Sequence, residues 1–160
     1  MTTSGDRLLH GLLLEVARDG SLELLEVAAP GGLLTLHPEQ DRSVLHGNVV
    51  RAEGIEHLAL PWSRAHVLML GASPVTAAVA AANLAARLGG GEGASVATVE
   101  VSDALRVRPA TWRAARTGER RWRLLAADGG PSVLLEIDDD GVPTGLEDAG
   151  SWPLELAPGR

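Results

Sequence analysis

One helical pattern stands out along the chain, at residues 73–88, with the sequence SPVTAAVAAANLAARL. Ser73 suits an N-cap, Pro74 suits the first helical position, and three glycines after Leu88 suit a helix end. At the helical period its polar residues share one stripe: Thr76, Asn83 and Arg87. The opposite face consists of alanines: Ala78, Ala81, Ala82 and Ala85. We therefore predict one apolar core helix at about 74–88, buried through its alanine face.

Short apolar runs, separated by an acidic residue and a glycine, predict β-hairpins in much of the remaining chain. Three segments have this form, with turns at Asp19-Gly20, Glu53-Gly54 and Asp140-Gly141. Asp-Gly favours the positive-φ geometry of tight hairpin turns. Two further segments, Trp112–Arg116 and Arg120–Leu125, flank Thr117-Gly118 and predict a fourth hairpin. The alternation of Val with polar residues over 95–101 is typical of a half-buried strand.

The order of these elements predicts an α+β fold that is mostly β. Hairpins precede and follow a single helix. Strands do not alternate regularly with helices, so the pattern does not favour a parallel sheet. We expect a curved antiparallel sheet, a spiral β-roll or partial barrel, wrapped around one apolar core helix. No linker divides the chain, so residues 1–160 are predicted to form a single domain.

Composition narrows the chemistry that this chain of 160 residues can perform. It has no Cys, Phe or Tyr, and its fourteen basic residues are all arginine. Without Cys there are no disulfides and no thiolate chemistry. The net charge of −7 disfavours nucleic acid and acidic membranes as partners. No apolar run is long enough to span a bilayer, and no signal peptide pattern is present, so we expect a cytoplasmic protein.

The second two-thirds of the chain carries a series of motifs in a distinctive order. They are Ser73-Pro74-Val75-Thr76, Asn83-Leu84, Arg87-Leu88, Leu105-Arg106-Val107-Arg108-Pro109, Trp112, Arg120-Arg121-Trp122-Arg123, a run from Leu134 to Val142, and Trp152. In this order they resemble the bacterial glycolipid-binding family of spiral β-roll proteins. That family favours Tyr where this chain has Trp or nothing, and it has a second Pro where this chain has alanines.

The resemblance implies antiparallel strands wound around a buried helix. It also implies a binding role, since the family's glycolipid function is inferred from its likeness in shape to lipoprotein carriers. The N-terminal third of the chain does not contribute to the resemblance.

Arginine is concentrated in residues 106–123, which contain seven arginines and one acid. This segment therefore has a charge of +6. The rest of the chain has a charge of −13, which gives the net charge of −7. Strand periodicity places Arg106 with Arg108, and Arg121 with Arg123, on shared faces. Guanidinium groups bind phosphates, carboxylates and polar head groups, so this segment is a candidate binding surface. The alternative is that these arginines form a solvated face and pair with acidic residues. The candidate ligand-binding residues are Trp62, Arg64, Arg108, Trp112, Arg121 and Arg123.

The other polar residues suggest no catalytic or metal site. Asp138-Asp139-Asp140 lacks the later Glu of a calcium loop and fits a hairpin turn better. The five His are scattered, and no His-x-x-x-His pair or Gly-x-Ser-x-Gly motif occurs. We expect no catalytic residues, no metal and no cofactor.

These observations favour a non-enzymatic binding protein for an apolar or amphiphilic small molecule of the lipid or glycolipid type. The ligand would lie between sheet and core helix, with arginine near the mouth of the cavity. One alternative is a structural or protein-interaction domain, a monomer or a homodimer formed through an exposed strand. Another is a nucleic-acid-binding module using the arginine-rich hairpin 106–123, with Trp112 or Trp122 as stacking platforms.

Overall fold

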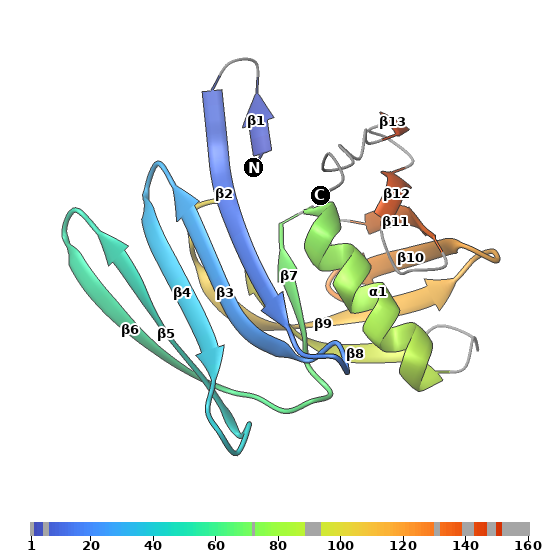
Figure 1. The fold of residues 1–160 in the computed structure, drawn as a ribbon, viewed down its shortest axis with the longest axis horizontal. Coiled ribbons are helices and arrows are strands. Elements are labelled where there is room, and N and C mark those ends of the chain that lie inside the picture. The colour runs from blue at the N-terminus through green and yellow to red at the C-terminus, as the bar shows by residue number, and fades with distance from the viewer. Residues whose placement is uncertain are drawn as a thin grey trace, which may run out of the picture.

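The computed structural model describes residues 2–4, 7–71, 73–88, 94–129, 132–138, 143–146 and 150–151. Within them the chain forms two β-sheets and one helix (Figure 1). The strands of the first sheet are β1 (Thr2–Ser4), β2 (Arg7–Val16), β3 (Leu22–Ala29), β4 (Gly32–Pro38), β5 (Val44–Arg51) and β6 (Gly54–Pro61). Those of the second sheet are β7 (Val67–Leu70), β8 (Ala94–Val101), β9 (Val107–Arg116), β10 (Arg121–Ala126), β11 (Ser132–Ile137), β12 (Pro143–Leu146) and β13 (Gly150–Ser151). The helix is α1 (Pro74–Leu88), and the predicted α+β, mostly β fold is confirmed.

The first sheet is an antiparallel meander in which each strand pairs with the next along the chain. Its predicted hairpins at Asp19-Gly20 and Glu53-Gly54 are confirmed. At the first turn Gly20 has φ of 75°, and Ser21 donates from both its N–H and its hydroxyl to Asp19 Oδ1. These hydrogen bonds hold the pKa of Asp19 below its ordinary value. The turn is therefore closed by its own side chains, as short Asp-Gly connections are.

The second sheet is also antiparallel among its described pairs, with one exception. The predicted hairpin around Thr117-Gly118 is confirmed as β9 and β10. The turn at Asp140-Gly141 lies outside the described residues, although β11 and β12 pair as that hairpin requires. The exception is β7, which runs parallel to β8 because α1 connects the two strands as a crossover. This parallel pair is absent from the prediction.

Helix α1 has the predicted bounds but a different buried face. Ala78 and Ala81 are buried as predicted, whereas Ala82 is exposed. Thr76, predicted on the polar stripe, is 1% exposed. Its hydroxyl accepts a hydrogen bond from the Leu70 N–H at 3.1 Å and donates to a backbone carbonyl of the preceding turn. The prediction was wrong here because a threonine whose hydroxyl is satisfied by nearby backbone is buried at little cost.

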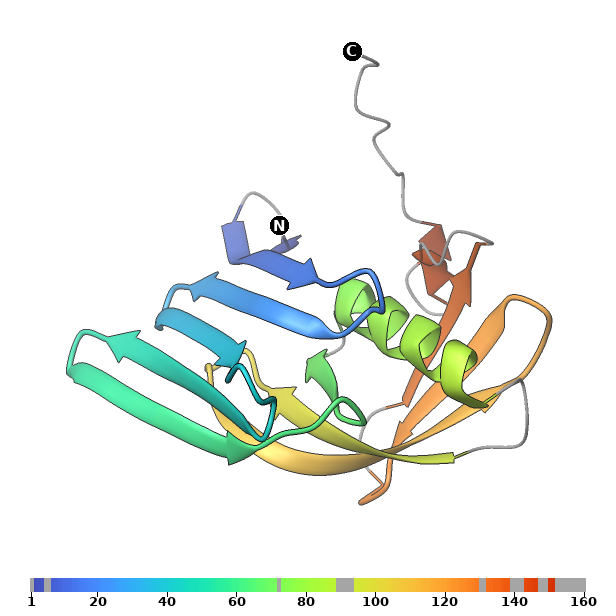
Figure 2. The same ribbon diagram turned by 60° about the horizontal axis from the view of Figure 1, so that its bottom comes forward.

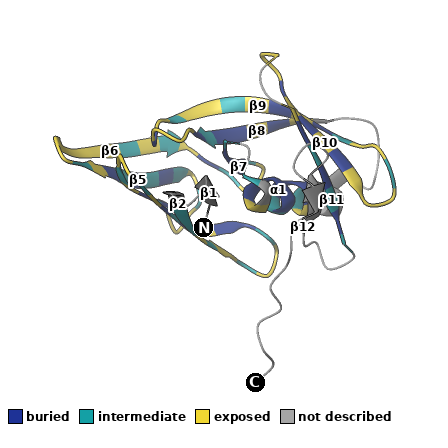
Figure 3. Ribbon diagram, turned by 90° about the horizontal axis from the view of Figure 1, so that it is seen from above, coloured by how far each residue is buried: buried dark blue, intermediate teal, exposed yellow. Residues whose placement is uncertain are grey.

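The second sheet curves beneath α1 and also reaches under the first sheet (Figure 2). Its helix-facing side chains form one buried cluster with the alanines of α1. The other face of β7 and β8 packs against the first sheet in a second cluster of leucines and valines. Buried positions accordingly lie along both faces of this part of the sheet (Figure 3). The helix is thus covered by the second sheet, while the first sheet lies on the opposite side of β7 and β8.

None of the described residues belongs to a helix with the length and hydropathy needed to cross a bilayer.

Candidate functional site

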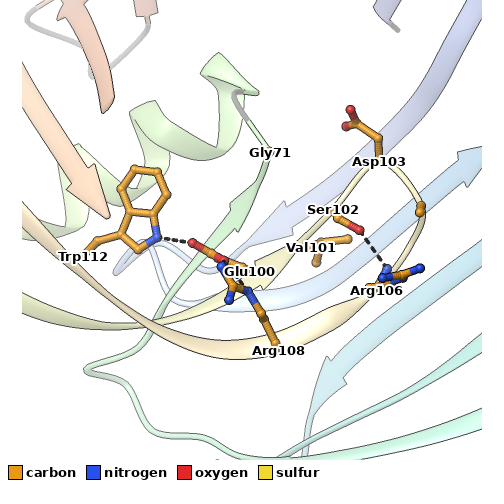
Figure 4. A pocket seen from close by; sticks show the side chains of 9 residues that line it. Gly71, Glu100, Val101, Ser102, Asp103, Arg106, Arg108 and Trp112 are labelled. Atoms are coloured by element: carbon orange, nitrogen blue, oxygen red, sulfur yellow. Dashed lines mark hydrogen bonds and ion pairs between the residues drawn. The ribbon is translucent and has the colours of Figure 1, made fainter. Parts of the chain in front are cut away.

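A groove with a volume of about 590 Å³ lies at the ends of β7 and β8. Figure 4 shows how its polar side chains meet there. They come from the end of β8, the following loop and the first half of β9. The groove is lined by Gly71, Glu100, Val101, Ser102, Asp103, Ala104, Arg106, Arg108 and Trp112. The groove therefore lies outside the carboxyl ends of the parallel strands β7 and β8.

Glu100 is held in the groove by two neighbouring side chains. Its Oε1 accepts a hydrogen bond of 2.6 Å from Trp112 Nε1, and its Oε2 accepts one of 2.8 Å from Arg108 Nε. A second Arg108 nitrogen lies 2.7 Å from Oε2, so the ion pair is held at two points. The carboxylate is only 16% exposed, while the Arg108 side chain is 63% exposed. Such an arrangement fixes the carboxylate and presents the guanidinium to the groove.

Strand register explains why these three residues meet. Arg108 lies directly across from Glu100 in the β8–β9 pair, so their side chains share a face. Trp112 lies four residues further along β9, on the same face, and its ring is buried in the cluster beneath α1. The indole N–H therefore reaches the carboxylate from inside the core. Asp128, in the turn after β10, lies 3.6 Å from Arg108 and completes the polar group.

The loop between β8 and β9 forms the other wall. Leu105 has φ of 56° and is 1% exposed, so a left-handed backbone turn inserts its side chain into the second cluster. Ser102 Oγ accepts from the Arg106 N–H at 3.2 Å, and backbone bonds join Ser102 to Leu105 and Arg106. Arg51 of the first sheet donates to the Leu105 carbonyl at 3.3 Å. A buried anchor and this network hold the exposed side chain of Arg106 at the groove.

The structure divides the predicted ligand-binding residues into three places. Arg108 and Trp112 lie together in the groove. Arg121 and Arg123 are exposed on the opposite face of the second sheet, since they alternate with the buried Trp122. Arg121 there donates to Glu136 across the β10–β11 pair at 2.7 Å. The expected shared face is therefore seen for Arg121 with Arg123, while Arg106 lies in the turn before β9.

Trp62 and Arg64 lie elsewhere, in the connection from β6 to β7. Trp62 is buried in the second cluster and stacks on His66 with a distance of 5.2 Å between ring centroids. Arg64 is exposed. The cleft beside Trp62 has a volume of only about 20 Å³, too small for a ligand head group. Neither Trp62 nor Arg64 is among the residues that line the groove.

Ser63 and His66 form a serine–histidine contact that the sequence did not suggest. Ser63 Oγ lies 2.9 Å from His66 Nδ1, and it also accepts from the Ala65 N–H at 3.2 Å. The backbone N–H of His66 in turn donates to the Ser63 carbonyl and closes a four-residue turn, which the side-chain contact spans. Partial burial lowers the pKa of His66, opposed by a backbone hydrogen bond with Ser63. This geometry is that of a serine-stabilised turn.

Four polar residues of the groove were not predicted as site residues: Glu100, Ser102, Asp103 and Arg106. The alternation over 95–101 predicts that Glu100 faces solvent, because it lies between Val99 and Val101. In the structure both faces of β8 pack against a buried cluster, so Glu100 is largely covered and takes its partners from β9. The loop residues carry no sequence signal. Among the described residues, no group of three or more His, Asp or Glu is arranged to hold a metal ion.

Comparisons with known proteins bear on the fold. No family model matches the chain, and no curated protein matches its sequence. A solved structure is similar. It is the crystal structure of a DUF1089 family protein from Pseudomonas aeruginosa, with a TM-score of 0.58 and 15% sequence identity. The match covers 95% of this chain and 98% of that chain, so the likeness extends over the whole fold. The resemblance to the glycolipid-binding family stays a prediction.

Proposed function

We propose that this chain is a non-enzymatic binding protein for a small amphiphilic molecule whose neutral, polyhydroxylated head lies in the groove. The observation that carries the proposal is the groove itself, with charged side chains of both signs around a fixed carboxylate. Its volume of about 590 Å³ is within the usual range of small-molecule sites, roughly 300–1,000 Å³.

The charges of the groove favour a neutral head over an anionic one. Two acids, Glu100 and Asp103, balance two arginines, Arg106 and Arg108, so the lining has no net charge. An anion would be attracted by the arginines and repelled by the nearby acids. A hydroxyl group both donates and accepts, so a sugar or polyol can satisfy guanidinium and carboxylate groups together. The mixture of donors and acceptors therefore fits a polyhydroxylated head.

The apolar part of the ligand is placed along the groove rather than beneath the helix. The inward alanines of α1 are at most 2% exposed and pack directly against the second sheet. The groove offers exposed Ala104 and the methylene stems of Arg106 and Arg108 instead. About four methylenes covered there would contribute about 3 kcal/mol before association costs. Together with the head group, we expect a dissociation constant on the order of 100 µM.

Two observations support binding rather than the alternatives. Both oxygens of Glu100 are engaged by donors, so the groove's central carboxylate is arranged as a fixed acceptor. The indole rings of Trp112 and Trp122 are 3% and 5% exposed, so neither offers a face on which a base could stack.

The test is titration calorimetry with octyl glucoside, octanoate and glucose, each below any micelle-forming concentration. We expect octyl glucoside to bind most tightly, because it alone supplies both the hydroxyl groups and the alkyl chain. Arg106→Gln should weaken that binding about tenfold. The matched control is Arg113→Gln, an exposed arginine on the opposite face of β9, which should leave it unchanged. Equal binding of octanoate, or equal loss in both variants, would contradict the proposal.

A further inference from the structure

β6 differs from the other strands that end the two sheets. It has eight residues and pairs with β5 along its whole length without a register shift. By contrast, β1 has three residues and a shifted register, and β13 has two residues. All four residues of β7 are buried, and the N–H of Leu70 at the end of β7 donates to the hydroxyl of Thr76. Among the described edges, β6 is thus the long and regular one (Figure 3).

The hydrogen-bonding direction along β6 follows from one backbone hydrogen bond just beyond its end. The Trp62 N–H donates to the Ser43 carbonyl at 2.9 Å, so even-numbered residues of this strand face β5. In an antiparallel pair this direction alternates from one residue to the next. The backbone N–H and C=O groups of Ile55, His57 and Ala59 therefore point away from β5, toward the open edge.

The side chains at this edge suit contact with another protein surface. Ile55 is 62% exposed and begins an apolar row that crosses the sheet through Val50 and Leu33, 40% and 41% exposed. The side chains of Ile55, His57 and Ala59 share one face of the strand, and that face of β6 has no Asp, Glu or Arg.

Charge does not oppose self-association at this strand, despite the net charge of −7. Glu56, the one acid of β6, lies on the opposite face, and Arg51 pairs with it at 2.8 Å. Two copies meeting edge to edge therefore bring no unbalanced charges together at the axis.

We propose that β6 pairs with β6 of a second copy of this chain, in antiparallel orientation, to form a two-fold homodimer. A two-fold axis at His57 places Ile55 of one copy opposite Ala59 of the other, so the outward backbone groups are mutually complementary. The same axis places Ile55, which ends the apolar row of each copy, beside the apolar Ala59 of the other. The first sheets of the two copies then form one continuous sheet, with the grooves on the second sheets left open.

The test is sedimentation equilibrium over about 5 to 200 µM protein, and the expected dissociation constant is on the order of 10–100 µM because the interface is small. Ile55→Lys adds a charge opposite Ala59 of the second copy, and Ala59→Pro removes an outward N–H that the β5–β6 ladder does not use. Each should weaken dimerisation at least about tenfold. The control is Leu13→Lys, an equally apolar residue that is 46% exposed on β2, which should dimerise as the parent does.

Circular dichroism of each variant shows whether it is folded, and Ile55→Lys decides the result if Ala59→Pro fails to fold. A parent protein that remains monomeric at about 200 µM would overturn the proposal. So would a dimer that both edge variants leave intact, because the interface would then lie elsewhere.

Discussion

Trp112→Phe isolates the hydrogen bond that fixes the groove's central carboxylate. The substitution keeps an aromatic ring in the core but removes the Nε1–H that donates to Glu100 Oε1 at 2.6 Å. Glu100 is 16% exposed, so water replaces the lost donor only in part. Hydrogen bonds to charged groups contribute about 1.5–3 kcal/mol, and the smaller ring adds about 1 kcal/mol for lost packing. We expect a total loss of about 3 kcal/mol.

The assay is urea denaturation of the parent and the variant, followed by circular dichroism. The matched control is Trp122→Phe, which removes the same ring volume from the same buried cluster. The hydrogen bond to Glu100 comes from Trp112 and is kept in this control. It should cost about 1 kcal/mol. In melting temperature, the difference of about 2 kcal/mol corresponds to roughly 4–8 °C for a chain of this length.

A double-mutant cycle with Glu100→Gln measures the interaction itself. If the indole N–H acts through the carboxylate charge, Trp112→Phe should cost about 1 kcal/mol less in the Glu100→Gln background. Equal losses for the two Trp→Phe variants, together with no coupling to Glu100, would refute the role given to this hydrogen bond.

Three further predictions concern the helix and its contacts. Ala81→Arg should cost several kcal/mol in urea denaturation because Ala81 is fully buried, whereas Ala82→Arg at the exposed neighbouring position should cost less than about 0.5 kcal/mol. Asn83→Ala should cost about 1 kcal/mol by removing the bond of 2.7 Å to the Gly20 carbonyl, and a loss no greater than that of an exposed helix site would contradict this. Burial lowers the pKa of His66, so the folded state favours the neutral imidazole. The contribution of His66 to stability is therefore complete above pH 6.5, the ordinary pKa of histidine, and is lost as the pH falls through the lowered pKa of the folded state. Denaturation between about pH 7 and 5 should therefore show a smaller pH dependence in His66→Gln than in the parent.

Local sequence signals were sufficient for most of the secondary structure. Ser73 and Pro74 fix the start of α1, and the hairpin turns follow from acidic residue–glycine pairs. The parallel β7–β8 pair was missed because pairing was inferred between strands adjacent in sequence. A signal was available in residues 67–70, a continuous apolar run typical of a strand buried on both faces.

The candidate site was predictable only in part, since it depends on which face of a strand each side chain takes. Trp112 and Arg108 were predicted, and strand register then brings Glu100 to them. Arg121 and Arg123 belong to the same arginine-rich segment, but their side chains lie on the other face of the same sheet. The position of Trp62 depends on how the two sheets pack together, which no local pattern encodes.

The central claim, that the groove binds an amphiphile through its head group, is tested most directly by NMR of the indole N–H groups. The signal of Trp112 Nε1–H, once assigned through Trp112→Phe, reports on the bond to Glu100 in the groove. During titration with octyl glucoside, we expect a saturable shift of this signal, with little change in the signal of Trp62, which lies outside the groove. A Trp112 signal that stays constant while octyl glucoside binds, or shifts equal to those of Trp62, would contradict the account.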